Sequence, residues 1–222
     1  NALKSIAARL PSGWQRTLKR GLYARQIRRG VFLTDEPEYA RLAEWIHPGD
    51  WVLDIGANVG HYTKRFSDLA GAGGRVIAFE PGPATFSLLA ANCLLFAHPN
   101  VTLFNAAASD ITALAGLATP TFDSGLDNGY EASLTPDPAG ALPVLTLAID
   151  SLDLQPRVAL VKIDAEGHEA RVLTGMERTL ARHRPVLIVE TGDPDLVSRV
   201  SGWGYAPEQL PGSPNYLFRP DP

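Results

Sequence analysis

Acidic residues follow three of the apolar runs in this sequence, each at the point where a β-strand is expected to end. They are Glu80, the pair Asp164 and Glu166, and Glu190. Carboxylates in a cleft can accept protons as general bases, or they can accept hydrogen bonds from the hydroxyl groups of a ligand. A single acid in this position would equally suit a helix N-cap. Because ligands bind outside the carboxyl ends of parallel strands, the recurrence of acids favours one shared site.

A glycine-containing turn at residues 54–60, which starts with Asp54, precedes the first of these acids. The run at residues 52–55 is apolar and β-branched, as in a buried strand, and the apolar spacing from Tyr62 onward is that of a helix. Gly56 and Gly60 carry no Cβ and permit a tight turn with close backbone approach. The helix that follows offers free N–H groups and positive potential to a ligand.

The position of Glu80 predicts the kind of ligand. It lies 24 residues after Gly56, at the end of the second expected strand, where an acid can accept both hydroxyls of a ribose. The ligand is therefore expected to carry a nucleoside. The dinucleotide fingerprint G-x-G-x-x-G is absent, because Asn58 stands where the second glycine would be. A nucleoside without phosphates fits this turn better than a dinucleotide.

Small residues follow the third expected strand, 101–104. Residues 106–108 are all alanine and leave room for a flat ring. Asn105 or Asp110 could bond the edge of an adenine at this point. An ordinary loop explains each of these two residues equally well.

Three motifs are D-I-G-A-N-V-G at residues 54–60, F-E-P at 79–81 and K-I-D-A-E-G at 162–167. Together they resemble the FkbM family of S-adenosylmethionine-dependent methyltransferases. The first two motifs are shared by many methyltransferases, whereas the third is specific to the family. The resemblance runs from about residue 49 to residue 218, which is most of the chain.

The resemblance implies S-adenosylmethionine as the cofactor, S-adenosylhomocysteine as the product, and a hydroxyl group on a sugar, lipid or natural product as the acceptor. The expected cofactor-binding residues are Asp54, Gly56, Asn58, Gly60, Glu80, Asn105 and Asp164. The candidates for removing the acceptor's proton are Asp164, Glu166, His168 and Glu190, with His61 at the turn as a further one. A divalent cation is compatible with these acids, but their spacing does not require one.

Asp164 and Glu166 are two residues apart, so they share one side if the strand stays extended. Two neighbouring carboxylates repel, which raises one apparent pKa and makes that group a better proton acceptor near neutrality. Lys162 falls on the same side and could moderate the repulsion or pair with an acid. An aliphatic hydroxyl is about as weak an acid as water, with a pKa of roughly 15.7. The carboxylate is therefore expected to accept the proton only as the new bond forms.

The elements that position these residues predict an α/β fold, Rossmann-like and doubly wound, with a mostly parallel sheet. Expected strands cover 52–55, 75–80, 101–104, 159–164 and 186–190, and expected helices cover 36–46, 62–70, 83–97, 168–182 and 194–200. An antiparallel C-terminal strand pair, near 205 and at 215–218, closes the sheet in this family. By the same resemblance, the weakly patterned residues 111–140 are expected to form a β-hairpin insertion that faces the acceptor.

The composition suits one α/β domain, with 222 residues, 45% of them hydrophobic, and no apolar run that approaches a membrane span. The one cysteine excludes an intramolecular disulfide, which is consistent with a reducing cytoplasm. Residues 1–30 carry eight basic residues and no acid, although the net charge of the chain is −4. We therefore expect a basic helical extension at 1–35 and the methyltransferase domain at 36–222.

The extension is expected to form short helices broken at Pro11 and Gly13. It could contact an anionic surface such as a membrane, or it could pack as a solvated helix beside the fold. The interleaved aromatic residues that favour single-stranded nucleic acid are absent, so no specific nucleic-acid partner is expected. The sequence does not indicate an oligomeric state.

Two other kinds of function are compatible with the same sheet. A nicotinamide-dependent oxidoreductase is disfavoured by the missing G-x-G-x-x-G and by the absence of a Tyr-x-x-x-Lys pair. A non-catalytic nucleoside-binding module is distinguished from an enzyme only by turnover of labelled cofactor with candidate acceptors.

Overall fold

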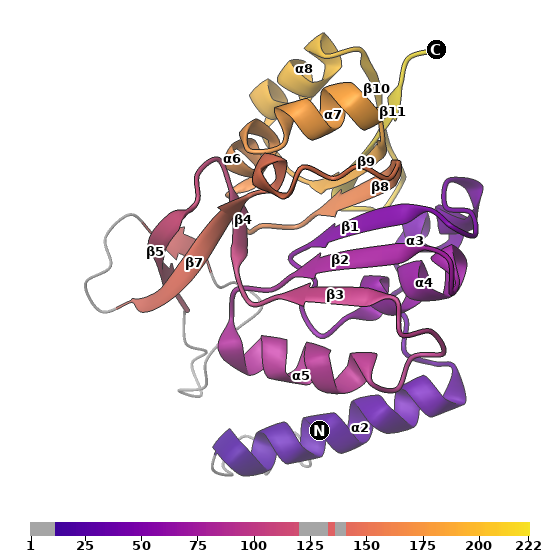
Figure 1. Cartoon of the computed structure of the whole chain (residues 1–222), viewed down its shortest axis with the longest axis vertical. Helices are drawn as coiled ribbons and strands as arrows, with labels where there is room; N and C mark the ends of the chain where they lie inside the picture. Colours follow the sequence, from indigo (N-terminus) through magenta and orange to yellow (C-terminus); the bar gives the residue numbers. More distant parts are fainter. Residues whose placement is uncertain (1–11, 120–132, 136–140) are drawn as a thin grey trace.

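The computed structural model describes residues 12–119, 133–135 and 141–222, and at its centre lies a seven-stranded sheet (Figure 1). In spatial order the strands are β10 (Tyr205–Gln209), β11 (Asn215–Pro220), β9 (Val186–Glu190), β8 (Val158–Ile163), β1 (Trp51–Ile55), β2 (Arg75–Phe79) and β3 (Val101–Phe104). The strands from β9 to β3 pair in parallel, whereas β11 is antiparallel to both β9 and β10. This arrangement confirms the predicted Rossmann-like sheet with an antiparallel C-terminal pair.

The strand order reverses at β1. The chain proceeds outward through β2 and β3 on one side of β1, and later through β8 and β9 on the other. Ligands of open α/β sheets bind at such a switch point, outside the carboxyl ends of the strands. The glycine turn after β1 is therefore flanked by the acids that follow β2 and β8.

Side chains alternate across this sheet, and each face buries its own core. The helices that cover the two faces are α3 (Pro37–Arg41), the 3-10 helix η1 (Leu42–Glu44), α4 (His61–Ala70), α5 (Pro83–Cys93), α6 (Glu169–Thr174), α7 (Glu177–His183) and α8 (Pro194–Gly202). Ile55 packs with residues of α6, α7 and α8, whereas Val52 and Leu160 pack with residues of η1 and α4. Asp54 and Lys162 follow Val52 and Leu160 by two residues, so both point toward the α4 side.

A second, four-stranded sheet lies beside the first one (Figure 1). Its strands in spatial order are β4 (Ala107–Ser109), β7 (Leu142–Ala148), β5 (Ala113–Ala118) and β6 (Ser133–Thr135). The antiparallel pairing of β5 with β6 agrees with the predicted β-hairpin insertion. The segment after β3, predicted as a loop, contains β4, which pairs in parallel with β7. Residues 120–132 and 136–140 of the predicted insertion lie outside the described residues.

Three predicted helices are shorter than expected or divided. The helix expected at 36–46 is α3 followed by η1, and the helix expected to reach residue 97 ends at Cys93. The helix expected at 168–182 is divided into α6 and α7 around Gly175. A Cβ on Gly175 would lie 1.8 Å from the carbonyl oxygen of Ser109, so the chain passes directly against β4 there.

The described part of the N-terminal extension contains the helix α2 (Ser12–Arg29), which begins one residue before Gly13, close to the predicted break. The other predicted break, at Pro11, lies outside the described residues. Tyr23 and Ile27 of α2 are buried against Leu88 of α5, beside which α2 runs in Figure 1. The helix thus packs beside the fold, while the division into domains at residue 35 stays a prediction.

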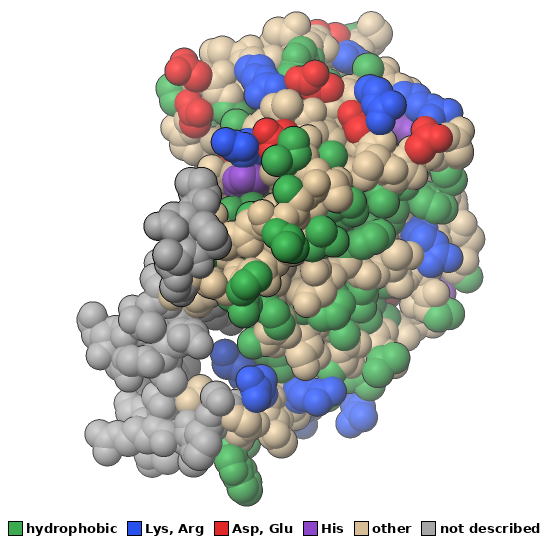
Figure 2. Space-filling model, turned by 60° about the vertical axis from the view of Figure 1, so that its left-hand side comes forward, with side chains coloured by type: hydrophobic (Ala, Val, Ile, Leu, Met, Phe, Trp, Pro, Cys, Tyr) green, Lys and Arg blue, Asp and Glu red, His purple; other side chains and the backbone are tan. Residues whose placement is uncertain are grey.

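The outer side of α2 is exposed. Trp14, Leu18 and Leu22 follow one another at helical spacing and are all more than half exposed. Lys and Arg side chains gather at this lower end of the molecule (Figure 2). In the part of the chain that the structure describes, no helix is long and apolar enough to cross a bilayer. Contact of α2 with an anionic surface stays a prediction.

Candidate active site

The turn after β1 contains three residues with positive φ, namely Gly56 (75°), Asn58 (50°) and Gly60 (97°). Asparagine tolerates this left-handed conformation better than most side chains. A Cβ on Gly56 would lie 1.8 Å from the carbonyl oxygen of Asp164. The close approach predicted at Gly56 is therefore an approach to the chain itself, and it brings Asp164 against the glycine turn.

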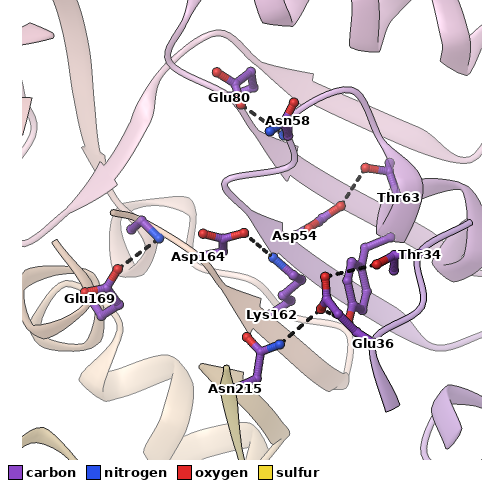
Figure 3. Close-up of polar contacts among 12 residues, drawn as sticks. Thr34, Glu36, Asp54, Asn58, Thr63, Glu80, Lys162, Asp164, Glu169 and Asn215 are labelled. Atoms are coloured by element: carbon purple, nitrogen blue, oxygen red, sulfur yellow. Dashed lines mark hydrogen bonds and ion pairs between the residues drawn. The ribbon is translucent and has the colours of Figure 1, made fainter. Parts of the chain in front are cut away.

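Glu80 is buried at the end of β2, with 7% of its surface exposed. One carboxylate oxygen accepts a hydrogen bond from the backbone N–H of Asn58 at 3.0 Å (Figure 3), and the other accepts one from Gly82 at 2.8 Å. Burial raises the pKa of Glu80 to about 7, although the two N–H donors oppose the rise. A carboxylate has about four acceptor positions. Each oxygen of Glu80 can therefore accept one further hydrogen bond, for example from a hydroxyl group.

Glu80 borders a cavity of about 70 Å³ at the carboxyl end of β2. We call it the nucleoside cavity, after the ligand that the sequence predicts, and its walls include Gly56, Asn58, Phe79, Ala107, Ala108, Leu117, Leu134 and Asp164. The residues predicted at 111–140 as acceptor-facing thus contribute Leu117 and Leu134 to the cavity of Glu80. The acceptor-facing role of this segment stays a prediction.

Asn105 and Asp110, the two candidates for an adenine contact, are engaged elsewhere. The side-chain amide of Asn105 donates to the backbone carbonyl oxygens of Glu80 and Pro81 at 2.9 and 3.0 Å. Asp110 forms an ion pair with Arg171 at 3.3 Å. Asn105 therefore holds the chain around Glu80, and its contact with a cofactor stays a prediction.

Asp54 and Lys162 lie buried beneath the glycine turn. The hydroxyl of Thr63 donates to one oxygen of Asp54 at 2.5 Å, and the ammonium group of Lys162 donates to Asp164 at 2.9 Å (Figure 3). Burial raises the pKa of Asp54, with the charge of Lys162 acting against it. Burial alone lowers the pKa of Lys162, but the charges of Asp164 and Asp54 outweigh it and raise that pKa. Lys162 is thus the paired cation that the sequence suggested.

A second space, of about 120 Å³, adjoins the glycine turn. We call it the turn cavity, and it is lined by Thr34, Glu36, Asp54, Gly56, Ala57, Asn58, His61, Tyr62, Lys162 and Asp164. It shares Gly56, Asn58 and Asp164 with the nucleoside cavity. The two cavities therefore adjoin at these three residues.

A third space lies on the far side of Asp164, next to the end of β9. We call it the acidic groove, and its acidic residues are Asp164, Glu166, Glu169, Glu190 and Asp193. Burial and, second to it, the charge of Asp164 raise the pKa of Glu190 to about 7. No three Asp, Glu, His or Cys side chains within the described residues are grouped so that they could hold a metal ion.

Asp164 and Glu166 do not share one extended strand. β8 ends at Ile163, and the chain then turns, with Glu166 at a φ of 50°. The condition for their predicted mutual repulsion is therefore not met. Burial first, and the charge of Asp164 second, raise the pKa of Glu190, and Asp164 also adds to the burial-driven rise in the pKa of Asp54 and of Glu80.

The two candidate histidines lie at different cavities. His168 borders the nucleoside cavity, and its Nε2 lies 2.8 Å from the hydroxyl oxygen of Ser109. His61 borders the turn cavity and stacks on Phe32, with 4.1 Å between ring centroids. Burial lowers the pKa of both histidines. Neither histidine borders the acidic groove.

The predicted acids line adjoining cavities, and Asp164 is the acid that these cavities share. Glu80, Asp164 and Glu166 border the nucleoside cavity, and Asp164, Glu166 and Glu190 border the acidic groove. Asp164 borders the turn cavity as well, and is therefore the residue at which the three spaces meet. Sequence reasoning missed Glu36, which resembled the start of a helix, and Asn215, which resembled an ordinary strand residue.

Comparison with known proteins identifies the family. The sequence model of the methyltransferase FkbM domain matches residues 54–200, more than half of the chain. The chain is 29% identical over 170 residues to 31-O-demethyl-FK506 methyltransferase FkbM of Streptomyces tacrolimicus, covering 63% of this chain and 64% of that protein. It is 30% identical over 148 residues to hexuronic acid methyltransferase AglP of Haloferax volcanii, covering 63% and 55%. The chain thus spans less than two thirds of either relative.

Among solved structures, the methyltransferase FkbM from Methylobacillus flagellatus KT superimposes with a TM-score of 0.55 at 15% identity, covering 92% of this chain and 59% of that chain. A likeness at this identity shows the fold alone, and the fold it shows is the Rossmann-like one described above. Together with the match over residues 54–200, these findings show that the chain belongs to the FkbM family of S-adenosylmethionine-dependent methyltransferases.

Proposed function

We propose that this protein transfers the methyl group of S-adenosylmethionine to a hydroxyl group of an acceptor, with Asp164 as the proton acceptor. The observation that carries the proposal is that Asp164 borders the nucleoside cavity, the turn cavity and the acidic groove. Transfer requires the nucleophile, the methyl carbon and the sulfur to lie in line at close range. The meeting point of the three spaces supports that arrangement.

In this proposal the adenosine part of the cofactor occupies the nucleoside cavity and the amino-acid part occupies the turn cavity. Glu80 accepts the ribose hydroxyls, and Leu117 and Leu134 cover the apolar surface of the nucleoside. The cofactor supplies a methyl group made reactive by the positive sulfur. Because both cavities include Gly56 and Asp164, these residues would hold the part of the cofactor that carries the sulfur.

The acceptor hydroxyl attacks the methyl carbon from the acidic groove. The oxygen–carbon bond forms while the carbon–sulfur bond breaks, and the electron pair of that bond stays on the sulfur of the product thioether. The hydroxyl proton goes to Asp164 as the bond forms, since the hydroxyl is too weak an acid to ionise beforehand. Lys162 binds one oxygen of Asp164 at 2.9 Å and so orients the other. Glu190, ionised above about pH 7, offers a second acceptor for that proton.

The lining of the acidic groove supports a neutral acceptor that carries hydroxyl groups. Its five acidic residues are joined by Thr191 and Gln209, and no Lys or Arg borders it within the described residues. Carboxylates bind hydroxyl donors but repel other anions. The two relatives are named for a methylation at oxygen and for a hexuronic acid. We propose a neutral sugar, lipid or natural-product hydroxyl, because this groove would repel the carboxylate of a hexuronic acid.

Calorimetry with S-adenosylhomocysteine and, separately, NAD tests the cofactor part of the proposal. We expect S-adenosylhomocysteine to bind and NAD at the same concentration to give no heat beyond dilution, because the turn lacks the glycines that admit a pyrophosphate. Binding of NAD alone would overturn the proposal in favour of an oxidoreductase. Binding of S-adenosylhomocysteine without transfer of labelled methyl to any hydroxyl compound would indicate a nucleoside-binding module instead.

A further inference from the structure

The turn cavity contains a buried carboxylate oxygen that lacks a partner. Asp54 is fully buried, and the hydroxyl of Thr63 donates to its Oδ2. No group within the described residues donates to its Oδ1. Buried polar atoms in native proteins are nearly always hydrogen-bonded, so an unpartnered one in a cavity wall indicates a donor on a ligand.

A second carboxylate, that of Glu36, is fixed at the same cavity. The hydroxyl of Tyr62 donates to its Oε2 at 2.6 Å, and the amide of Asn215 donates to the same oxygen at 3.0 Å. The hydroxyl of Thr34 donates to its Oε1 at 3.1 Å. Figure 3 shows Thr34, Asn215 and Lys162 grouped around Glu36. Three donors from separate parts of the chain hold this side chain in place.

The charges of the turn cavity favour a cation. Glu36, Asp54 and Asp164 border it, and Lys162 is the one Lys or Arg among its lining residues in the described part of the chain. The ammonium group of Lys162 is already bonded to Asp164 and lies 4.9 Å from the ring centroid of Tyr62. Two carboxylates thus face the cavity without a cation bonded to either of them. A positively charged ligand group would supply that cation.

We propose that Glu36, together with the unpartnered oxygen of Asp54, binds the α-ammonium group of the cofactor's amino-acid part. The inference rests on the proposed function, because it assigns the nucleoside cavity to adenosine and the adjoining turn cavity to the amino acid. It also extends the site beyond residues 54–200, the part matched to the family. Glu36 is then a specificity residue that separates ligands with an amino-acid part from ligands without one.

Two ligands distinguish this role from a structural one. S-adenosylhomocysteine carries the amino acid, whereas 5′-methylthioadenosine has the same adenosine and sulfur with a methyl group in its place. In Glu36→Gln we expect the affinity for S-adenosylhomocysteine, measured by calorimetry, to fall about 10- to 100-fold, as for loss of a charged hydrogen bond. The affinity for 5′-methylthioadenosine should stay within about twofold of wild type.

Glu38→Gln is the matched control. Glu38 is 2% exposed and also accepts hydrogen bonds from Tyr62 and Asn215, but it does not border the turn cavity. It should therefore change the ratio of the two affinities much less than Glu36→Gln does. An equal loss for both ligands in Glu36→Gln, or no loss for S-adenosylhomocysteine, overturns the inference. A wild-type protein that binds neither ligand overturns the proposed function itself, and the inference with it.

Tyr62→Phe keeps the inference testable if circular dichroism shows that Glu36→Gln is unfolded. This change removes one of the three donors that hold Glu36 and leaves the carboxylate in place. We expect a loss of affinity confined to S-adenosylhomocysteine and smaller than that in Glu36→Gln. A loss shared equally by 5′-methylthioadenosine, or no loss at all, contradicts the assignment of Glu36.

Discussion

Asp164→Asn should lower the rate of methyl transfer about 100- to 10,000-fold, the range typical of general base catalysis. The change keeps the shape of the side chain but removes the charge that accepts the acceptor's proton. The affinity for S-adenosylhomocysteine should change less than about tenfold, because Glu80 and the glycine turn hold the nucleoside. Single-turnover transfer of labelled methyl, with the hydroxyl acceptor that wild type methylates, gives the rate, and calorimetry gives the affinity.

Glu190→Gln is the control for this prediction. Glu190 borders the acidic groove but neither of the other cavities, so we expect a smaller loss of transfer rate. At saturating cofactor concentration, wild-type transfer should rise as the pH increases through about 7, where Glu190 ionises, and this rise should be missing in Glu190→Gln. Transfer at the wild-type rate in Asp164→Asn would contradict the assignment of the base and leave Glu190, Glu166 or His168 as the candidates.

Binding of S-adenosylhomocysteine should strengthen as the pH rises through about 7, because the pKa of Glu80 lies there. Ribose hydroxyls donate to the ionised carboxylate of Glu80. Binding should therefore weaken below that pH, where the carboxylate is protonated. Glu80→Ala should remove this pH dependence and weaken binding by about 1.5–3 kcal/mol for each hydroxyl bond lost. Calorimetry between about pH 5.5 and about pH 8.5, roughly one and a half units on each side of the pKa of Glu80, measures both effects.

Glu190 titrates in the same pH range and must be separated from Glu80. Glu190→Gln should keep the pH dependence of binding, because Glu190 does not border the nucleoside cavity. If binding keeps its wild-type strength and pH dependence in folded Glu80→Ala, then Glu80 does not hold the ribose. In that case the nucleoside would have to lie away from the end of β2.

Local sequence patterns were enough to predict the parallel strands and the acids that follow them, whereas the antiparallel C-terminal pair was expected from the family resemblance. The spacing of apolar residues and the turn that follows are enough to locate a strand such as the one before Glu80, and with it the acid at its end. The same patterns could not predict that β8 ends at Ile163. The end of β8 depends on the turn through Glu166, and the sequence gives no signal for the positive φ of that residue.

Long-range contacts account for the residues that sequence reasoning missed. Glu36 and Asn215 are 179 residues apart and meet at 3.0 Å because β11 lies inside the sheet beside β9. Leu117 and Leu134 reach the nucleoside cavity only through the second sheet. The division of one predicted helix at Gly175 depends on contact with Ser109 of β4. None of these pairings has a signal in the spacing of neighbouring residues.

A crystal structure of the protein with S-adenosylhomocysteine is the most direct measurement of whether the cavities meet at a methyl-transfer site. We predict the adenosine in the nucleoside cavity with its ribose on Glu80, the amino acid in the turn cavity, and the sulfur next to Asp164. The acceptor oxygen would then have room to lie within roughly 3–3.5 Å of the transferred methyl carbon, as a reactive geometry requires. Adenosine bound outside the nucleoside cavity, or a sulfur that faces away from Asp164 and the acidic groove, would contradict the proposal.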